Sequence, residues 1–318
     1  MKTRKKYRHP LTAADFFAGI GGFRIGFEKA GYRIVYANDN DKYCCETYKT
    51  NFGEIDPRDI RSIDPESLPD FDVLLAGFPC QPFSMVGKRN GLEDDRGKLF
   101  FYIVKILNAK QPRAFVLENV KHLLYQKGGE IFKKIIKTLE WAGYRVFYQI
   151  LNSQNFGVPQ YRERLFIVGF ENPVVQSEQF QFPIGKRSKT LKEILERRAD
   201  ENYYLSQQYY RGLLKHKRRH SRNGNGFGCE IANLNGVART LVAGNMGRER
   251  NLIRDRPNKK NKWGIRRLTI RECARLQGFP ESFKFPVSIT QAYKQLGNAV
   301  TVPVAKAIAT RMTRVLSK

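Results

Sequence analysis

The sequence predicts an α/β fold: a doubly wound, mostly parallel sheet covered by helices on both faces, with a second, smaller domain. Three observations indicate this. Short apolar runs alternate with longer amphipathic segments through the first half, as strands of a parallel sheet alternate with crossover helices. A glycine-rich turn follows the first apolar run. After Pro183 the alternation stops and a basic stretch rich in Asn and Gly begins.

The apolar runs and helix punctuation define the expected elements in chain order. Gly31 ends the first helical pattern, and Gly278 followed by Pro280 ends a late one. We expect residues 1–185 and 285–318 to form the larger domain and 186–284 a smaller domain with a hinge. The expected strands are 13–18, 33–37, 71–76, 114–118, 144–151 and 164–170, and the expected helices are 22–30, 42–51, 98–108, 130–142, 268–276 and 301–315.

The charge of the chain points to a polyanionic partner. Lys and Arg number 57 against 30 acidic residues, a net charge of +27 with a pI near 10. Residues 186–262 hold 20 of the basic residues and 7 of the acidic ones, so we expect the nucleic-acid surface there. A solvated basic surface is the alternative. The 41% apolar content is too high for a disordered chain, and no apolar run reaches the ~18 residues of a membrane helix.

Cysteine usage argues against disulfides and structural zinc. The five cysteines form no Cys-x-x-Cys pair. His216 and His220 have the spacing of two metal ligands on a helix, but the basic residues 217–219 between them would repel a cation, so we expect no metal. The basic N-terminus is followed by no apolar stretch, so we expect no secretory signal and a cytoplasmic protein acting at the nucleoid.

A glycine-rich turn and an acid indicate a cofactor site. Residues 15–23 close a strand and open a helix, and their glycines, Gly19-x-Gly21-Gly22, depart from the Gly-x-Gly-x-x-Gly of pyrophosphate cradles. Asp39 ends the second strand, where an acid typically binds ribose hydroxyls. A nucleoside cofactor without a pyrophosphate, such as S-adenosylmethionine, fits both features. A purely structural glycine turn is the alternative.

Cys80 lies between two prolines in the segment Gly77–Ser84, directly after a strand. Loops at the carboxyl ends of strands form the site in doubly wound folds, so this position predicts a rigidly held, reactive thiol. The following residues 81–97, rich in glycine and charge, are expected to form a mobile lid. A small buried thiol is the alternative.

Two further motifs supply charged groups at strand ends. Glu118 follows an apolar strand, where partial burial is expected to raise its pKa and favour the neutral acid. Arg162 and Arg164 precede the next strand, and strand alternation would put both on one face, toward an anion, a carboxylate or a base oxygen. A helix cap for Glu118 and an exposed salt-bridge pair for the arginines are the alternatives.

Six motifs that follow one another along the chain resemble those of a known family. They are Asp15-Phe-Phe-Ala-Gly-x-Gly-Gly, Pro79-Cys-Gln, Glu118-Asn-Val, Gln160-x-Arg-x-Arg, Arg266-Arg-Leu-Thr-x-Arg-Glu-Cys-Ala-Arg and Gln295-Leu-Gly-Asn-Ala-Val. The chain resembles the bacterial DNA cytosine-5 methyltransferases of restriction–modification systems, over residues 12–183 and 264–310. The resemblance implies methyl transfer from S-adenosylmethionine to C5 of a flipped-out cytosine in double-stranded DNA, by a monomer that needs no metal and no membrane.

The resemblance also implies a role for each position. Cys80 would add to C6, Glu118 would act at N3, Arg164 would hold O2, and Arg162 would lie beside the base and the loop. Stretch 186–262 would be the target-recognition region, in which Glu249 and Asn251 could also read base edges. The implied cofactor contacts are Phe17, Gly19, Ile20, Gly22, Asp39, Asn40, Asp59, Ile60, Gly77, Pro79, Leu99, Asn298 and Val300, and the DNA contacts Gln81, Ser84, Arg96, Arg239, Thr240, Arg248 and Arg250.

The sequence departs from the family pattern at three positions. Asn40 replaces a frequent aromatic residue, which puts the stacking contact to adenine in doubt, and Met85 and Val86 replace a polar loop contact. A transfer-RNA cytosine-5 methyltransferase on the same scaffold is the main alternative, but the Cys-Phe-Thr signature of that branch is absent. A regulator with an inactive site is disfavoured because the cysteine, glutamate and arginines are all present.

Overall fold

The structure is a computed structural model that describes residues 10–79, 99–172, 180–222, 224, 228–244, 249–257 and 262–317. The chain divides into two compact units. Unit 1 consists of Met1–Leu151, Glu163–Ile184 and Val304–Lys318, and unit 2 of Asn152–Arg162 and Gly185–Pro303. The expected boundary at residue 185 lies next to a unit boundary. Residues 152–162 and 285–303, which we expected in the larger domain, belong to unit 2.

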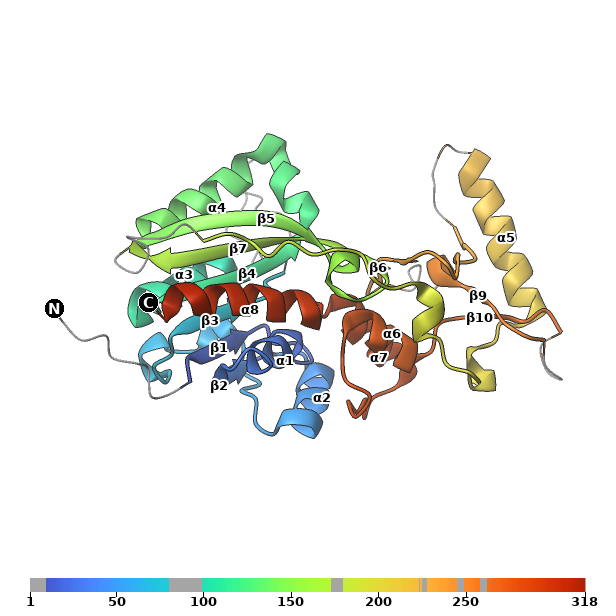
Figure 1. Ribbon diagram of the computed structural model, residues 1–318, viewed down its shortest axis with the longest axis horizontal. Helices are drawn as coiled ribbons and strands as arrows, with labels where there is room; N and C mark the ends of the chain where they lie inside the picture. Colours follow the sequence, from blue (N-terminus) through green and yellow to red (C-terminus); the bar gives the residue numbers. More distant parts are fainter. Residues whose placement is uncertain are drawn as a thin grey trace. The chain divides into compact units, whose positions relative to one another are not determined.

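Unit 1 is built on a six-stranded sheet with the order β2-β1-β3-β4-β7-β5 (Figure 1). The first four strands in this order pair in parallel, and β7 runs antiparallel to β4. The predicted mostly parallel sheet is therefore confirmed. The strands are β1 (Thr12–Phe16), β2 (Arg33–Asn38), β3 (Val73–Ala76), β4 (Ala114–Val120), β5 (Tyr144–Asn152) and β7 (Glu163–Glu171).

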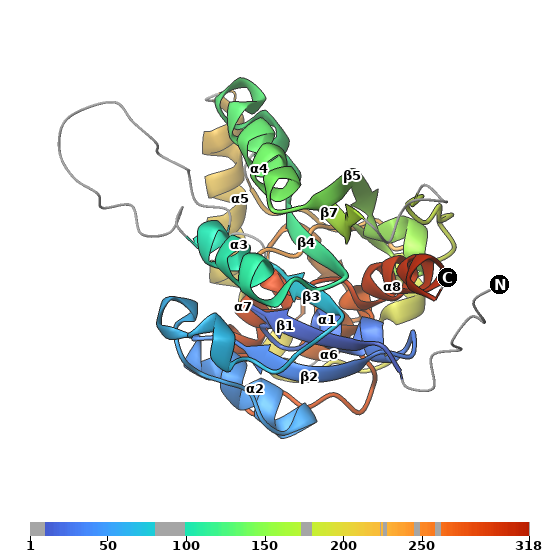
Figure 2. The ribbon, with the colours of Figure 1, turned by 90° about the vertical axis from the view of Figure 1, so that its left-hand side faces the viewer.

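Helices cover both faces of this sheet, with α3 and α4 on one face and α1 and α8 on the other (Figure 2). Strand β3 is buried throughout, as its continuous apolar run predicts. Its Leu74 packs in the main core with Phe16, Phe115 and Ile103, and each fully buried side chain of this size contributes about 1.5–3 kcal/mol. The helices are α1 (Gly22–Glu28), α2 (Lys42–Phe52), α3 (Leu99–Lys110), α4 (Glu130–Trp141) and α8 (Val302–Leu316).

In the part of unit 2 that the structure describes, there are two small strand pairs and three helices that begin and end within the unit. Strand β6 (Gln160–Tyr161) pairs in parallel with β8 (Ala238–Arg239), and β9 (Ile253–Arg254) pairs antiparallel with β10 (Ile265–Arg266). The helices are α5 (Gln207–Arg222), α6 (Ile270–Gln277) and α7 (Ile289–Asn298). The helix α6 was expected from the sequence, whereas α5 and α7 were not. Short 3-10 helices occur at Ile60–Ser62, Pro65–Ser67, Lys121–Gly129, Ser153–Phe156, Leu191–Ile194 and Glu201–Tyr203.

A buried ionic network organises the start of α6. Thr269 and Glu272 form a reciprocal cap, in which the Thr269 side chain accepts from the Glu272 amide and the Glu272 carboxylate accepts from the Thr269 amide. The Glu272 carboxylate binds the Arg266 guanidinium through two bonds of 2.8 and 2.9 Å, and Arg266 Nε binds Asp255 at 2.6 Å. Both Arg266 and Glu272 are almost fully buried. The Arg266-to-Arg275 motif therefore serves the fold of unit 2.

Within the described ranges no helix is long and apolar enough to span a membrane. The same ranges hold no group of three or more side chains arranged to bind a metal ion. The rings of His216 and His220 contact each other at a tilt of 47°, with centroids 4.3 Å apart.

Candidate active site

Three strand termini of unit 1 meet at one edge of the sheet. Strands β3 and β4 are parallel neighbours, so their carboxyl ends lie together, and antiparallel β7 begins at the same edge. The register pairs Glu118 with Phe166 and Val120 with Arg164. Glu118 and Arg164 are thus diagonal neighbours on one face, within reach of each other's side chains.

Asn119 ties the end of β4 to the chain that leaves β3. Its side-chain amide donates to the Phe78 carbonyl at 3.1 Å, and its Oδ1 accepts from the Val120 amide at 2.8 Å. Asn119 is 2% exposed, so these bonds are shielded from water. Pro79 is the last described residue before Cys80, which itself lies outside the described residues. Asn119 therefore fixes the backbone position from which the Cys80 segment departs.

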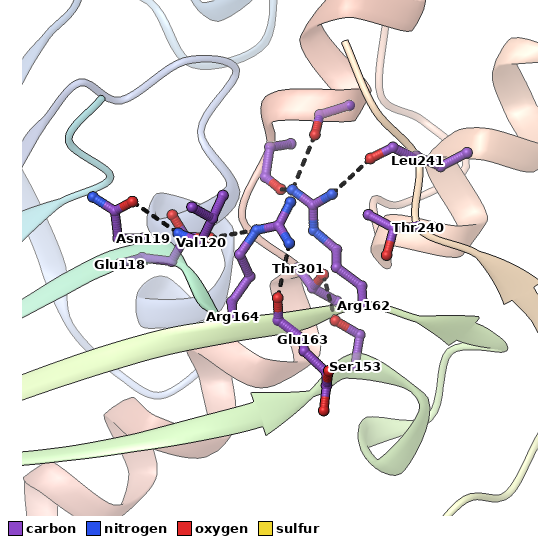
Figure 3. A network of polar contacts seen from close by, with 12 residues as sticks. Glu118, Asn119, Val120, Ser153, Arg162, Glu163, Arg164, Thr240, Leu241 and Thr301 are labelled. Atoms are coloured by element: carbon purple, nitrogen blue, oxygen red, sulfur yellow. Dashed lines mark hydrogen bonds and ion pairs between the residues drawn. The ribbon is translucent and has the colours of Figure 1, made fainter. Parts of the chain in front are cut away.

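Glu118 and Arg164 form an ion pair at this edge. Arg164 Nε lies 3.1 Å from Glu118 Oε1, and Arg164 Nη1 donates to the Glu163 carbonyl at 2.8 Å (Figure 3). The side chains retain 10% (Glu118) and 16% (Arg164) of their exposure. Because the pair is held within a continuous sheet and still reaches the surface, it can receive a planar polar group. Proton donation by Glu118 stays a prediction.

Arg162 has a different environment from Arg164. Strand β6 ends at Tyr161 and β7 begins at Glu163, so the expected alternation along one strand is interrupted at Arg162. Within unit 2 its guanidinium donates to the carbonyls of Leu241, Gly297 and Ala299 at 2.8–3.0 Å (Figure 3). The expectation that both arginines turn toward one anion is therefore wrong. Arg162 is 1% exposed and supports the backbone on both sides of Asn298.

The glycine-rich turn after β1 has the backbone that its sequence requires. Gly19 and Gly21 have φ angles of 57° and 83°, in the left-handed region that favours glycine. A side chain at Gly21 would collide with the Phe52 ring, whereas the space beside Gly19 is open. The Gly19 amide donates to Asp39 Oδ2 at 2.8 Å. The turn is thus held against the end of β2, with one open face at Gly19.

The two acids predicted to bind the cofactor, Asp39 and Asp59, lie near the end of β2, where Asp39 follows the strand and Asn40 reaches Asp59. Asp39 Oδ1 accepts from the Asp41 amide at 2.8 Å, so its two oxygens bridge the glycine turn and the start of α2. The exposed Asn40 donates to Asp59 Oδ2 at 3.3 Å. The Arg61 guanidinium, bound to the same carboxylate, lowers the pKa of Asp59. Asp59 is therefore ionised at neutral pH.

This cluster fits S-adenosylmethionine better than a dinucleotide. Its two carboxylates would repel a pyrophosphate but suit ribose hydroxyls and a cationic sulfonium. Each carboxylate oxygen has two acceptor positions, so Asp39 can accept further bonds. The open face at Gly19 admits close approach of a ligand to the backbone.

The remaining predicted cofactor residues fall into two sets. Those in unit 1 lie at the strand ends and nearby turns: Phe17, Ile20 and Gly22 around the glycine turn, Ile60 after Asp59, Gly77 and Pro79 after β3, and Leu99 at the start of α3. Asn298 and Val300 belong to unit 2, where Asn298 is exposed at the end of α7. A common cofactor site formed by both sets stays a prediction.

The predicted DNA contacts in unit 2 have mixed environments. Arg239 is largely exposed and pairs with Glu230 at 2.6 Å, and the Thr240 hydroxyl donates to the Tyr161 carbonyl. Arg250 is half-buried. The expectation that Glu249 and Asn251 read base edges is wrong, because both are buried. Glu249 accepts from Tyr209 and Arg267, and the Asn251 side chain bonds to both backbone groups of Arg239.

Four of the predicted contacts lie outside the described residues: Gln81, Ser84, Arg96 and Arg248. One positioning residue, Asn119, was part of a predicted motif but had no role assigned to it. The feature of the sequence that could have revealed it is a residue with a side-chain amide directly after the glutamate at the end of the strand. Only the pairing of β3 with β4 reveals which carbonyl this amide meets.

Comparison with known proteins identifies the fold and the family. A family model described as C-5 cytosine-specific DNA methylase matches residues 11–314. The chain belongs to this family. As a DNA cytosine-5 methyltransferase, it is 45% identical over 317 residues to the Type II methyltransferase M.HpaII of Haemophilus parainfluenzae, covering 94% of this chain and 88% of that protein. It is 43% identical to M.DsaV of Dactylococcopsis salina, covering 95% and 86%.

Solved structures confirm the methyltransferase fold. The S. pombe Dnmt2 methyltransferase superposes with a TM-score of 0.77 at 22% identity, over 96% of this chain and 98% of that one. A Spodoptera frugiperda DNMT2 mutant superposes with a TM-score of 0.76 at 21% identity, over 97% and 100%. At these identities the likeness concerns the fold alone. The α/β methyltransferase fold predicted from the sequence is thereby confirmed.

Proposed function

We propose that this DNA cytosine-5 methyltransferase acts through Cys80, Glu118 and Arg164 on a cytosine rotated out of the double helix. The observation that supports this is the arrangement at one sheet edge. The Glu118–Arg164 pair lies where β4 ends and β7 begins, and Asn119 holds the backbone two residues before Cys80. A base stacked inside the DNA double helix could not reach side chains at the ends of β4 and β7, so the cytosine must rotate out of the DNA.

Each of these groups has one chemical task. The Cys80 thiolate adds to C6 of the ring, which makes C5 nucleophilic. Glu118 donates a proton to N3 as charge develops there, and Arg164 donates a hydrogen bond to O2. After methylation the C5 proton passes to solvent water, Cys80 departs as the thiolate, and the Glu118 carboxylate takes back the N3 proton, which restores the aromatic ring and the enzyme. S-adenosylmethionine, when bound, supplies the methyl group on its sulfonium.

The residues of unit 1 that would hold S-adenosylmethionine are those of the acidic cluster. Gly19 offers the open backbone, Asp39 would bind ribose hydroxyls, and Asp59 with Asn40 would lie near the adenine. Within unit 2, Arg162 holds the Gly297 and Ala299 carbonyls on either side of Asn298, another predicted cofactor contact.

The biological setting belongs to the same proposal. The two relatives described above carry names of Type II methyltransferases and come from bacteria. We propose that this enzyme is likewise the modification enzyme of a Type II restriction–modification system, acting as a monomer in the bacterial cytoplasm on a specific double-stranded sequence.

Methyl transfer and covalent trapping test the mechanism. We expect Cys80→Ala to abolish transfer of tritiated methyl groups to duplex DNA while DNA binding persists, and only the unchanged enzyme to form a stable adduct with DNA containing 5-fluorocytosine. Near-normal transfer by Cys80→Ala would refute the role of Cys80. The same assay on bulk transfer RNA distinguishes the alternative: preferential methylation of RNA would overturn the choice of DNA as substrate.

A further inference from the structure

Helix α5 of unit 2 carries a dense positive charge that the proposed active site does not use. Its 16 residues, Gln207–Arg222, include six Lys and Arg residues and no acidic residue. The residues of unit 2 that were individually expected to contact DNA, among them Arg239, Thr240 and Arg250, all lie outside α5. Helix α5 stands beside β9 and β10 in Figure 1.

The two faces of α5 differ sharply. Tyr210, Leu213 and Leu214 pack against a buried cluster of Leu205, Cys229, Leu252 and Ile265, which anchors the helix to its unit. A neighbouring, exposed face carries basic side chains at helical spacings of four, three and four residues, which places them in one row. This basic stripe consists of Arg211, Lys215, Arg218 and Arg222, with Arg219 beside it, and all five are exposed.

The charges of the stripe are not neutralised by neighbouring acids. Among the described residues, none of these five side chains forms an ion pair, whereas Arg239 and Arg267 of the same unit pair with Glu230 and Glu249. Like charges three and four residues apart on a helix repel one another, at a cost of a few tenths of a kcal/mol per pair. A polyanion bound along the stripe would relieve this repulsion.

The dimensions and the chemistry of the stripe fit a nucleic-acid backbone. From Arg211 to Arg222 it extends about 16 Å along the helix axis, at 1.5 Å per residue. Phosphates of one DNA strand advance about 3.4 Å per base pair, so the stripe can follow about five of them. An anionic membrane is disfavoured, because the apolar face that would enter the lipid is already occupied by the core of unit 2.

We propose that the basic stripe of α5 binds backbone phosphates of the substrate DNA and lengthens the contact of unit 2 with DNA beyond the bases that it reads. The contact is sequence-independent, because guanidinium and ammonium groups on a helix surface meet phosphates and no base edge. This inference rests on the proposed function in one respect, that duplex DNA is the substrate.

The salt dependence of DNA binding measures these contacts directly. Each phosphate contact contributes about 0.9 to the slope of log K against log salt concentration. We expect the triple variant Arg211→Gln, Arg218→Gln, Arg222→Gln to reduce this slope by two to three units on a 30-base-pair duplex, with affinity at low salt falling at least tenfold. The corresponding Arg→Lys triple variant keeps the charge and should retain most of the slope.

A matched control removes the same number of charges from another helix. Lys133, Lys134 and Lys137 are exposed on α4 of unit 1, and changing all three to Gln should leave the slope within one unit of the unchanged enzyme. Circular dichroism checks that each variant is folded. An unchanged slope in the α5 variant, or an equal loss in the α4 control, overturns the proposal.

Two further readouts separate the remaining possibilities. Sedimentation with vesicles of anionic phospholipid tests the membrane: vesicle binding that the α5 variant loses, together with an unchanged DNA slope, overturns the proposal in favour of a lipid surface. Methyl transfer to DNA by the unchanged enzyme is measured in parallel. Absence of that transfer refutes the proposed function, whereas transfer with an unchanged slope in the variant refutes only the role of α5.

Discussion

Arg162 and Arg164 are two residues apart in one motif, yet they serve different regions of the molecule. Arg164 belongs to the sheet edge of unit 1 and pairs with a carboxylate, Glu118, with part of its side chain still exposed. Arg162 belongs to unit 2, is buried, and donates to three main-chain carbonyls. An arginine that pairs with a partly exposed carboxylate at the end of a strand can also contact a substrate. One that binds backbone carbonyls determines the path of the chain. The partners, and not the residue type, distinguish the two roles.

The largest effect expected from this contrast is on stability. Arg162→Met removes the donor of three buried carbonyls, of which Ala299 keeps a second donor, Gln277. The two carbonyls left unpaired cost about 1–3 kcal/mol each, so we expect the unfolding free energy to fall by about 2–6 kcal/mol. Urea unfolding followed through Trp263 in a Trp141→Phe background reports on unit 2. The control is Arg254→Met, an exposed arginine of the same unit, which should cost under about 0.5 kcal/mol. A loss below 1 kcal/mol for Arg162→Met would contradict the structural role.

The next effect is on catalysis rather than folding. Glu118→Gln keeps the shape and an acceptor oxygen for Arg164 but cannot donate a carboxylic proton. We expect kcat to fall at least ~100-fold, about 2.7 kcal/mol in activation free energy, with thermal stability nearly unchanged. Single-turnover methyl transfer at saturating DNA and cofactor measures this. A loss under threefold would remove Glu118 from its role as the acid.

The smallest expected effect is on the pH dependence of stability. It arises from Asp15, a second buried carboxyl of unit 1 besides Glu118. Asp15 is fully buried at the end of β1, and burial raises its pKa to about 8, against the opposing influence of Arg24. The folded state therefore binds the Asp15 proton more tightly than the unfolded state does. The contribution of Asp15 to the unfolding free energy is thus highest at low pH and declines as pH rises toward 8. Between pH 6 and pH 8 we expect a loss of about 2 kcal/mol from this group.

The variant Asp15→Asn isolates that contribution. Its stability should lack this decline, so the difference between the unchanged protein and the variant should grow from pH 6 to pH 8. Urea unfolding at both pH values gives the difference. Parallel pH dependence in the two proteins would show that Asp15 is not protonated in the folded state.

Much of unit 1 follows from local sequence, because its strands are short apolar runs with clear limits. The expected strand 33–37 is observed as Arg33–Asn38, and the expected helix 42–51 as Lys42–Phe52. Asp41 explains the start of that helix, since its carboxylate accepts from the amides of Tyr43 and Cys44. Helix α5 was missed because it buries none of its residues fully and contains Gly212, so its pattern is that of a solvated basic segment.

The sequence predicted the strand-end positions of several candidate site residues but not their contacts. Glu118, Arg164 and Asp39 were chosen from strand-end positions, and the structure places each at such a position. Sequence spacing could not show that Arg162 leaves the strand, nor that Glu249 and Asn251 are buried. Those outcomes depend on partners 12 to 137 residues away in the chain, such as Arg239 for Asn251 and Ala299 for Arg162.

The sequence by itself determined the α/β class and the family, and it supplied the chemical groups that we propose for the reaction, because apolar periodicity and short motifs are local properties of the chain. Tertiary structure decided which of these groups meet. Parallel pairing of β3 with β4 brings Asn119 to the Phe78 carbonyl, and antiparallel pairing of β7 with β4 brings Arg164 to Glu118. The physical reason is that hydrogen bonds and ion pairs depend on distances of about 3 Å, which long-range packing alone sets.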